Sequence, residues 1–515
     1  MDVKEKFVST IQEGYNFKGD SILLGSAILN GETLTNTQIK IPLKTLNRHG
    51  LIAGATGTGK TKTLQVIAEG LSAYSIPVLM MDIKGDLSGL AKPGSSNAKI
   101  EERHQKIGVP YQPTGFPVEL FTISQEKGVR LRATVSEFGP ILLSKILELN
   151  DVQSGLMSVI FKYCDDKQLP LLDLKDLKST LQFLSDAGKS EFESAYGKIS
   201  TTSMGTILRK VIELEQQGAD LFFGERSFEV EDLLRIDSNG RGVISIFRLI
   251  DIQNRPKLFS TFMLCLLAEI YSTFPEEGDL DRPKLVVFID EAHLIFQEAS
   301  KALLEQIETI IKLIRSKGVG VFFCTQNPTD IPNSVLAQLG LKVQHALRAF
   351  TAKDRKEIKL TAENYPISEF YKTEDLLTSL GIGEAAITAL SEKGVPTPLA
   401  ATLLCAPKSR MDILSPVEID ELIAKSQLTR KYNEVIDRES AYEILTQKYT
   451  RAVQQEEYKT TPREEPSAKK EKTVMGEILG STVTRQIVRT VAREVTRGLL
   501  GILGIGSTHR KRSLF

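Results

Sequence analysis

Short apolar runs alternate with helical patterns from residue 50 onward, and this alternation predicts an α/β fold. The runs have the length of strands, and the segments between them place apolar residues on one side of a helix. Runs that are apolar throughout are typical of strands covered on both faces, so we expect a mostly parallel sheet between layers of helices. The predicted strands span residues 50–53, 76–82, 116–123, 242–249, 285–290, 319–324 and 341–349.

Two segments depart from this alternation. Residues 1–45 contain two candidate strands around Asn30-Gly31, which predict a small β appendage that is too short to be a domain of its own. Residues 135–235 carry helical patterns, and we interpret them as a helical insertion within a domain that spans residues 46–410.

Residues 91–117 are rich in Gly, Ser and Pro, which predicts a solvent-exposed loop. The segment also carries basic residues, so a loop that contacts nucleic acid is the alternative. These residues are Lys92, Lys99, Arg103 and Lys106.

The chain changes character again after residue 410. Residues 411–459 are typical of a charged helical extension, and residues 460–473 have the composition of a disordered linker. In residues 474–515, arginines recur every four residues beside a row of Val and Ile, which predicts a basic amphipathic helix. Such a helix suits a membrane surface or a partner helix, and docking on a subunit of its own oligomer is equally compatible with the periodicity. The arginines are Arg485, Arg489, Arg493 and Arg497.

The composition is that of a globular protein without net charge. The 515 residues include 65 Lys and Arg against 65 Asp and Glu, so any DNA contact has to come from a local patch such as the lining of a pore. The four cysteines form no C-x-x-C pair, and the first residues lack the apolar core of a signal peptide. We therefore expect a cytoplasmic protein, peripheral at the inner face of the membrane if the basic helix binds lipid.

The most specific chemical signal is Gly54-Ala-Thr-Gly-Thr-Gly-Lys-Thr61, which fits the phosphate-binding pattern G-x-x-x-x-G-K-S/T. It lies between a predicted strand and a predicted helix, in the order that a phosphate-binding loop (P-loop) needs. Glycines allow close approach to the phosphates, and the N–H groups at the helix N-terminus bind them. We expect Lys60 to reach the β- and γ-phosphates and Thr61 to ligate Mg²⁺. The expected nucleotide contacts are Gly54, Ala55, Thr56, Gly57, Thr58, Gly59, Lys60, Thr61 and Lys62.

Hydrolysis of a bound nucleotide also needs carboxylates, and Leu285-Val-Val-Phe-Ile-Asp290-Glu291 supplies them. The apolar residues predict a buried central strand, and the two acids follow at its carboxyl end, where ligands bind in open α/β sheets. We expect Asp290 to hold Mg²⁺ through water and Glu291 to orient and polarise the attacking water.

Three further polar residues are candidates for completing the reaction. Gln326 ends the next predicted strand, where its amide can contact the γ-phosphate or the water, or simply cap the strand. Arg315 ends the preceding helix, where it either complements the helix dipole or acts at a subunit edge as an arginine finger. Arg348 is a second candidate for a charge sensor at the nucleotide. His293 lacks a ligand-spaced partner, so we expect it to pack or hydrogen-bond locally rather than to form a zinc site.

Together these motifs resemble the HerA/FtsK superfamily, and within it the YjgR-like branch of bacterial HerA-like helicases. The resemblance covers about residues 46–410. It rests on Gly50-Leu-Ile-Ala-Gly-Ala-Thr-Gly-Thr-Gly-Lys-Thr61, Asp82-Ile-Lys-Gly-Asp86, Asp290-Glu-Ala-His293, Ile314-Arg-Ser-Lys-Gly318 and Thr325-Gln-Asn-Pro328.

The resemblance implies a RecA-like ATPase that binds ATP, assembles as a homo-hexameric ring and moves double-stranded DNA through its pore. In such rings, the arginine at the position of Arg315 reaches the neighbour's nucleotide, and the glutamine at the position of Gln326 is the sensor. Residues 1–45 can supply only a remnant of the β-barrel that HerA carries ahead of its P-loop.

Three functions follow from these patterns. The first is an ATP-hydrolysing ring motor that acts as a DNA translocase or helicase. The second is an ATPase that works on protein or at the membrane surface through residues 474–515. The third is a nucleotide-binding regulator with little turnover, in which ATP only sets the oligomeric state.

Overall fold

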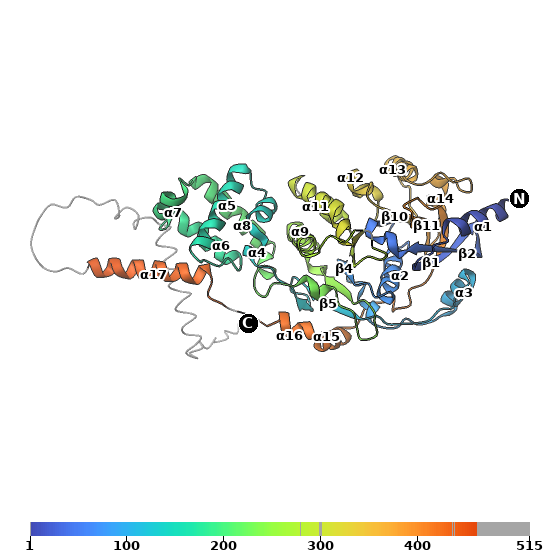
Figure 1. The fold of residues 1–515 in the computed structure, drawn as a ribbon, viewed down its shortest axis with the longest axis horizontal. Helices are drawn as coiled ribbons and strands as arrows, with labels where there is room; N and C mark the ends of the chain where they lie inside the picture. Colours follow the sequence, from blue (N-terminus) through green and yellow to red (C-terminus); the bar gives the residue numbers. More distant parts are fainter. Residues whose placement is uncertain (1, 279, 298–300, 435, 437, 461–515) are drawn as a thin grey trace, which may run out of the picture. The chain divides into compact units, whose positions relative to one another are not determined.

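The computed structural model describes residues 2–278, 280–297, 301–434, 436 and 438–460 (Figure 1). The chain divides into one compact unit that ends at Arg438 and a second that begins at Glu439. Of the second unit, the structure describes helix α17 (Ala441–Thr460). The predicted linker beyond residue 460 and the predicted basic helix at 474–515 therefore lie outside the described residues.

A 12-stranded sheet forms the centre of the first unit, in the order β2-β1-β12-β11-β10-β3-β9-β8-β4-β7-β5-β6. From β10 to β6 all neighbouring strands pair in parallel, whereas the pairs from β2 to β10 are antiparallel. The parallel strands are β3 (Gly50–Ala53), β4 (Val78–Asp82), β5 (Val118–Thr122), β6 (Val129–Arg130), β7 (Ile244–Arg248), β8 (Leu285–Ile289), β9 (Val319–Thr325) and β10 (Leu341–Gln344). The others are β1 (Ser21–Leu29), β2 (Glu32–Pro42), β11 (Glu384–Thr388) and β12 (Ala400–Leu404).

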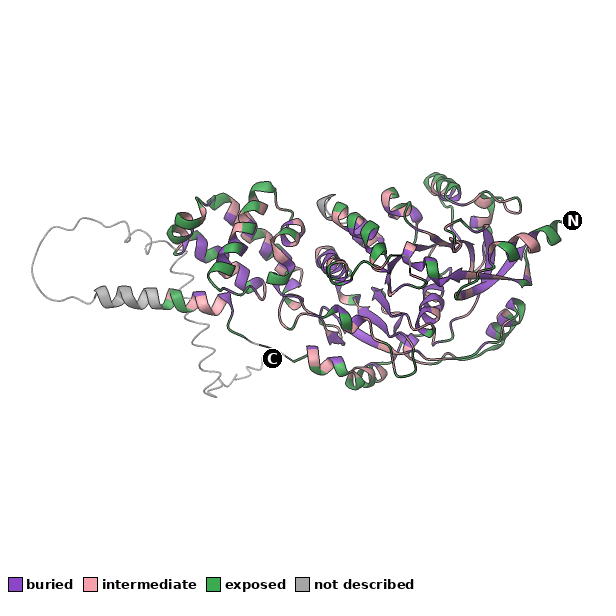
Figure 2. Cartoon of the chain, in the orientation of Figure 1, coloured by how far each residue is buried: buried purple, intermediate pink, exposed green. Residues whose placement is uncertain are grey.

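The central strands are buried along their whole length, which explains why they are apolar throughout. Every residue of β3, β4, β8 and β9 is buried, as expected for strands between two layers of helices (Figure 2). All seven predicted strands are present, and the mostly parallel α/β fold is confirmed.

The N-terminal strands extend this sheet instead of forming a separate layer. β1 and β2 form a hairpin whose turn residues Asn30 and Gly31 have φ of 50° and 81°, and β1 also pairs with β12. Helix α1 (Val3–Gly14) precedes them, an element that the sequence analysis missed. Its buried residues, Phe7 and Ile11, are one turn apart, so a single apolar row attaches it to the sheet.

Helices occupy the segments between the strands. Helix α2 (Lys60–Ala73) follows β3, and α9 (Pro256–Thr273), α10 (His293–Gln297) and α11 (Lys301–Ile314) surround β8 in the sequence. Residues 135–235 contain α4 (Val135–Ile146), α5 (Asp151–Asp166), α6 (Leu174–Ser185), α7 (Lys189–Tyr196) and α8 (Thr201–Gln216). Later helices are α12 (Asn333–Leu336), α13 (Ala352–Glu363), α14 (Thr373–Ser379), α15 (Pro416–Lys425) and α16 (Gln427–Tyr432). None of the described helices combines the length and the apolarity that crossing a membrane requires.

The predicted loop at residues 91–117 is wrong in part, because its middle is helix α3 (Ala98–Ile107). The Asn97 side chain accepts a hydrogen bond from the N–H of Ile100, and Gly108 ends the helix with φ of 81°. The buried face consists of Ile100, His104 and Ile107. One buried side chain per turn is enough here because the other positions of the helix carry long polar side chains, which favour a helix.

Candidate nucleotide site

The P-loop is held at its start by both strands that flank β3. The N–H of Gly54 donates to the carbonyl oxygen of Thr325 at 3.3 Å, and that of Ala55 donates to Ala346 at 2.9 Å. Gly54 has φ of 150°, and a Cβ there would lie 2.5 Å from the Cβ of His345. Only glycine therefore fits at this first position of the loop.

The far side of the loop is held by a turn that no sequence motif indicated. Gly59 begins helix α2 with φ of 115°, and the carbonyl oxygen of Thr58 accepts a hydrogen bond from the N–H of Gly383 at 2.9 Å. Arg103 of α3 in turn donates from Nη1 to the carbonyl oxygens of Gly383 and Leu404, both at 3.0 Å. Arg103 thus holds the turn at Gly383 that bonds to the P-loop, and its guanidinium is only partly exposed.

Lys60 lies inside the loop and is buried, with 8% of its surface exposed. Its ammonium donates to the carbonyl oxygens of Gly54 at 2.7 Å and Ala55 at 3.2 Å. Burial and then the nearby charge of Lys84 lower the pKa of Lys60, while the carboxylates of Glu291 and Asp290 act in the opposite direction. Lys60 is therefore positioned between the loop that binds phosphate and the predicted acidic pair.

Asp290 follows β8 and is suited to hold a cation beside that loop. It is buried, and burial raises its pKa to about 6, with Lys84 opposing this rise. Its Oδ2 is buried, and among the described residues it has no hydrogen-bond partner. An unsatisfied buried carboxylate oxygen of this kind is a fitting ligand for Mg²⁺.

The metal would depend on the nucleotide as much as on the protein. In the part of the chain that the structure describes, no three His, Cys, Asp or Glu side chains gather in a way that could hold a metal ion. Mg²⁺ is commonly bound by one carboxylate together with substrate phosphates, so Asp290 and the Thr61 hydroxyl fit the ion when a triphosphate supplies the other ligands.

Glu291 lies between two basic side chains. The ammonium of Lys84 forms an ion pair with Oε1, and Nδ1 of His293 lies 3.1 Å from Oε2. Glu291 is 5% exposed and adopts φ of 47°, the left-handed region that non-glycine residues rarely occupy. The local role expected for His293 is confirmed, whereas the contact of Lys84 was not anticipated.

Gln326 reaches the P-loop, whereas Arg315 and Arg348 do not. Oε1 of Gln326 accepts a hydrogen bond from the hydroxyl of Thr56 at 3.2 Å. Arg315 is exposed and precedes β9, at the opposite edge of the sheet. Among the described residues, the exposed Arg348 donates only to backbone carbonyl oxygens, those of Thr378 at 3.2 Å and Leu347 at 3.5 Å.

Lys62, which was expected among the nucleotide contacts, instead donates to the carbonyl oxygen of Met411.

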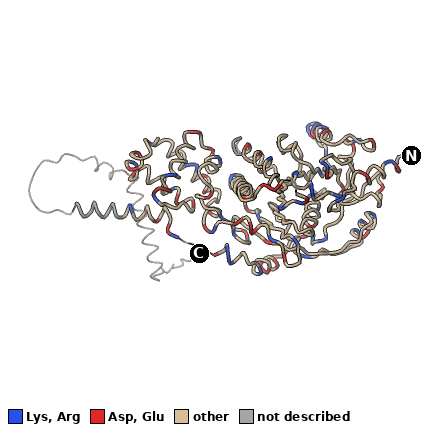
Figure 3. Tube along the Cα trace, in the orientation of Figure 1, with Lys and Arg blue, Asp and Glu red and all other residues tan. Residues whose placement is uncertain are grey.

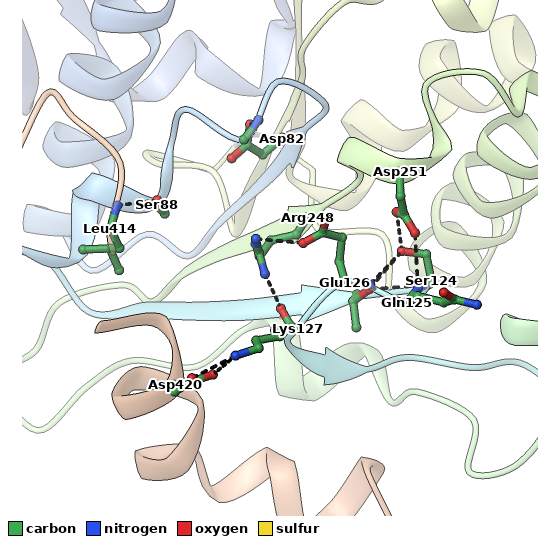
Figure 4. Close-up of polar contacts among 12 residues, drawn as sticks. Asp82, Ser88, Ser124, Gln125, Glu126, Lys127, Arg248, Asp251, Leu414 and Asp420 are labelled. Atoms are coloured by element: carbon green, nitrogen blue, oxygen red, sulfur yellow. Dashed lines mark hydrogen bonds and ion pairs between the residues drawn. The ribbon is translucent and has the colours of Figure 1, made fainter. Parts of the chain in front are cut away.

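At the same edge of the sheet, the loops beyond the acidic pair are held by hydrogen bonds and an ion pair (Figure 4). Asp82, at the end of β4, accepts from the N–H groups of Gly85 at 2.6 Å and Leu87 at 3.2 Å. After β7 and β5, the loops are joined by an ion pair between Arg248 and Glu126 at 2.8 Å and by a hydrogen bond from Ser124 Oγ to Asp251 at 2.6 Å. Basic and acidic residues are interspersed along the described chain, in keeping with such local pairing (Figure 3).

Two buried polar residues support the P-loop helix and were missed by the sequence analysis. Glu69 accepts from the N–H groups of Lys408 and Ser409, both at 2.9 Å, and burial raises its pKa. Nε2 of His345 lies 2.9 Å from the hydroxyl of Thr63, and burial lowers its pKa to about 4. A charged residue on an otherwise apolar helix face was the one available signal for Glu69, and nothing local indicated His345.

Comparison with known proteins identifies a family match and several relatives of this chain. The family model described as Helicase HerA-like C-terminal matches residues 27–510. The chain is 23% identical over 358 residues to the DNA double-strand break repair helicase HerA of Sulfolobus acidocaldarius, an alignment that covers 68% of this chain and 64% of the relative. It is 26% identical over 323 residues to the DNA import protein CedB of the same organism, covering 62% of this chain and 46% of that one. The chain thus spans less than two thirds of the length of either relative.

Among solved structures, the chain resembles the bacterial conjugative coupling protein TrwBdeltaN70. The TM-score is 0.50 with 14% identity, and the match covers 79% of this chain and 94% of that one. At this identity the similarity supports the fold, and it agrees with a large α/β sheet that presents a P-loop at its carboxyl edge.

Proposed function

The chain belongs to the Helicase HerA-like C-terminal family, and from this premise we propose that it is a motor that hydrolyses ATP and moves along duplex DNA. The predicted resemblance to the HerA/FtsK superfamily is confirmed, and so is the RecA-like α/β fold. One observation carries the proposal. Lys60 at the start of α2, Asp290 and Glu291 after β8, and Gln326 after β9 meet around the P-loop at one edge of the sheet.

These residues divide the work of hydrolysis. The N–H groups at the start of α2 and the ammonium of Lys60 bind the β- and γ-phosphates. Thr61 and Asp290 would hold Mg²⁺, which would neutralise negative charge on those phosphates. Glu291 accepts a proton from the attacking water, and Gln326 places its amide beside the γ-phosphate while it contacts Thr56 of the loop. ATP is the nucleotide that the family resemblance implies, and the sequence contains no guanine-specifying N-K-x-D run.

We propose that the site is completed by a second copy of the chain in a homo-hexameric ring. The side chain of Arg315 is exposed, has no hydrogen bond or ion pair among the described residues, and lies at the edge of the sheet opposite its own P-loop. An arginine in that position does not reach the nucleotide of its own chain, so we propose that it serves a neighbour's, where it would stabilise the charge of the transition state.

DNA is the proposed substrate because the relatives carry names that refer to DNA, in repair and in import. A neutral chain has to bind it through local contacts, such as the lining of a ring. We keep the expected cytoplasmic location as part of this proposal. Protein and membrane surfaces, the alternatives considered from the sequence, find no counterpart in the names of these relatives.

ATP turnover of the full chain, measured without DNA and with duplex or single-stranded DNA, tests the proposal. We expect duplex DNA to raise kcat at low salt and the stimulation to fall as salt rises, because counterions compete for the phosphate backbone. The variant Lys60→Ala is the control for contaminating ATPases. Turnover that neither form of DNA changes at low salt would contradict the DNA proposal while leaving the ATPase intact.

Movement itself needs a second measurement. A third strand bound to a duplex is displaced by a motor that travels along the duplex, so its release can be followed in the presence of ATP. We expect release by the wild type and none with Glu291→Gln. Stimulated turnover without release would indicate a DNA-activated ATPase and not a translocase.

A further inference from the structure

We infer that Lys84 is a positioning residue that restrains Glu291 and so keeps ATP turnover low until the site is activated. The inference rests on the proposed function in one respect, the role of Glu291 as general base. It assigns to Lys84 a task that is separate from phosphate binding by Lys60.

Lys84 comes to Glu291 from a loop that is fixed independently of it. The carboxylate of Asp82 accepts hydrogen bonds from the N–H groups of Gly85, Asp86 and Leu87, which closes the loop after β4. Beyond it, Ser88 Oγ accepts from the N–H of Leu414 at 3.0 Å (Figure 4). Lys84 is therefore presented on a hydrogen-bonded loop, and its ammonium reaches Glu291 at the end of β8.

The backbone of the same loop is packed on its other side. A Cβ at Gly85, which has φ of 79°, would lie 2.4 Å from Cδ1 of Ile250, and Gln253 donates to the carbonyl oxygen of Ile83 at 2.9 Å. The loop is thus fitted against the residues that follow β7. Because the loop is held from two sides, the backbone at Lys84 stays in place, and the ion pair breaks when either side chain turns away.

Glu291 is held in a conformation that requires such contacts. Its φ of 47° is strained for a residue with a side chain, and such strain persists where the surroundings enforce it. Lys84 and His293 contact one carboxylate oxygen each, and the side chain of Glu291 is only 7% exposed. The carboxylate is therefore turned toward the ammonium of Lys84 and the imidazole of His293, each beside one of its oxygens.

The charge balance favours this pairing. Burial opposes the charged form of Lys84, but the hydrogen bond to Glu291 and the charge of Asp290 outweigh it, so that the pKa of Lys84 is raised. Loss of this cation should thus free the carboxylate of Glu291 to turn toward the attacking water.

The test compares Lys84→Met, which removes the charge, with Lys84→Arg, which keeps it, and with Lys99→Met as the matched control. Lys99 is an exposed lysine of α3 with no role in the site. Steady-state ATP turnover is measured without DNA. We expect kcat of Lys84→Met to rise about tenfold, with KM for ATP unchanged, because the ion pair affects the base and not the phosphates. Lys84→Arg and Lys99→Met should keep the wild-type rate.

A rate of Lys84→Met equal to or below that of the wild type would overturn the inference, and a lowered rate would instead make Lys84 a cation for the phosphates. A tenfold rise in Lys84→Arg as well would also overturn it, because the effect would then be steric. Unfolding midpoints and oligomer mass of each variant identify a damaged fold. DNA does not enter this readout, so a wild type that DNA fails to stimulate contradicts the DNA proposal and leaves the Lys84 result to stand by itself.

Discussion

Arg315 and Gln326 lie beyond opposite ends of the same strand. Strand β9 contains seven residues, Val319–Thr325, which at the rise of an extended chain separate its ends by about 20 Å. Gln326 follows the strand at the edge where the P-loop lies, and Arg315 precedes it at the other edge. One chain cannot bring both residues to one nucleotide, whereas two neighbouring chains in a closed ring can.

This separation predicts that Arg315→Ala and Lys60→Ala complement each other. Each variant alone should lose about 10³-fold or more of its turnover, because one lacks the finger and the other lacks nucleotide binding. In an equal mixture, about a quarter of the interfaces join an intact nucleotide site to an intact Arg315 if subunits assort at random. ATP turnover of the mixture should recover accordingly.

Lys312→Ala provides the control for the mixing experiment, since it removes an exposed basic residue of α11, the helix that ends just before Arg315. It should behave as the wild type both alone and in mixtures. A mixture of Arg315→Ala with Lys60→Ala that stays inactive, although the two variants are shown to co-assemble, would contradict the role of Arg315 across the interface.

Gln326 is expected to act in turnover and not in nucleotide affinity. Gln326→Ala removes the amide beside the γ-phosphate and the contact with Thr56, so kcat should fall while the dissociation constant for a fluorescent ATP analogue changes little. Thr56→Val removes only the hydrogen bond of 3.2 Å and should retain most of the activity. If both variants lose the same activity, the effect comes from the hydrogen bond between Gln326 and Thr56 and not from a contact of the amide with the γ-phosphate.

Glu291→Gln should retain ATP binding and lose hydrolysis. The amide preserves the size of the side chain but cannot accept the proton of the attacking water, so kcat should fall by about 10²–10⁴-fold. Rapid phosphate release by Glu291→Gln would exclude Glu291 as the base.

Stability should decrease below neutral pH because of His49. Burial lowers the pKa of His49 to about 4, and its ring accepts from the N–H of Val321 at 3.0 Å while Nε2 contacts the carbonyl oxygen of Ile311 at 2.8 Å. The folded state thus binds this proton less readily than the unfolded state, whose pKa is about 6.5. The stabilisation is complete above about pH 6.5 and is lost as the pH falls toward 4.

Between pH 7.5 and 5.5 this loss amounts to about 1.4 kcal/mol for His49. The variant His49→Gln should therefore lose less stability than the wild type over that interval, as measured by urea midpoints, although it starts from a lower value. From pH 7.5 to 8.5 the two proteins should change in parallel, since neither state binds the proton there. Equal acid sensitivity of both proteins would refute the assignment.

The sequence alone determined the elements whose signal is local. The P-loop is one contiguous segment between a strand and a helix, and the strands of the parallel sheet are apolar because both of their faces are buried. The acids after β8 could be placed at the nucleotide edge because the carboxyl ends of parallel strands lie together. Weaker local signals failed, as for α1 and α3, where one or two apolar side chains per face attach a short helix.

Only the tertiary structure decided which distant residues meet. The pairing of Lys84 with Glu291, the support of Thr58 through Gly383 and Arg103, and the contact of Thr63 with His345 join segments that lie far apart in the chain. The pairing of β1 with β12 likewise joins segments that lie far apart in the chain. Such contacts depend on strand order and register across the whole sheet, and a polar side chain in the sequence carries no record of the partner that will satisfy it once both are buried.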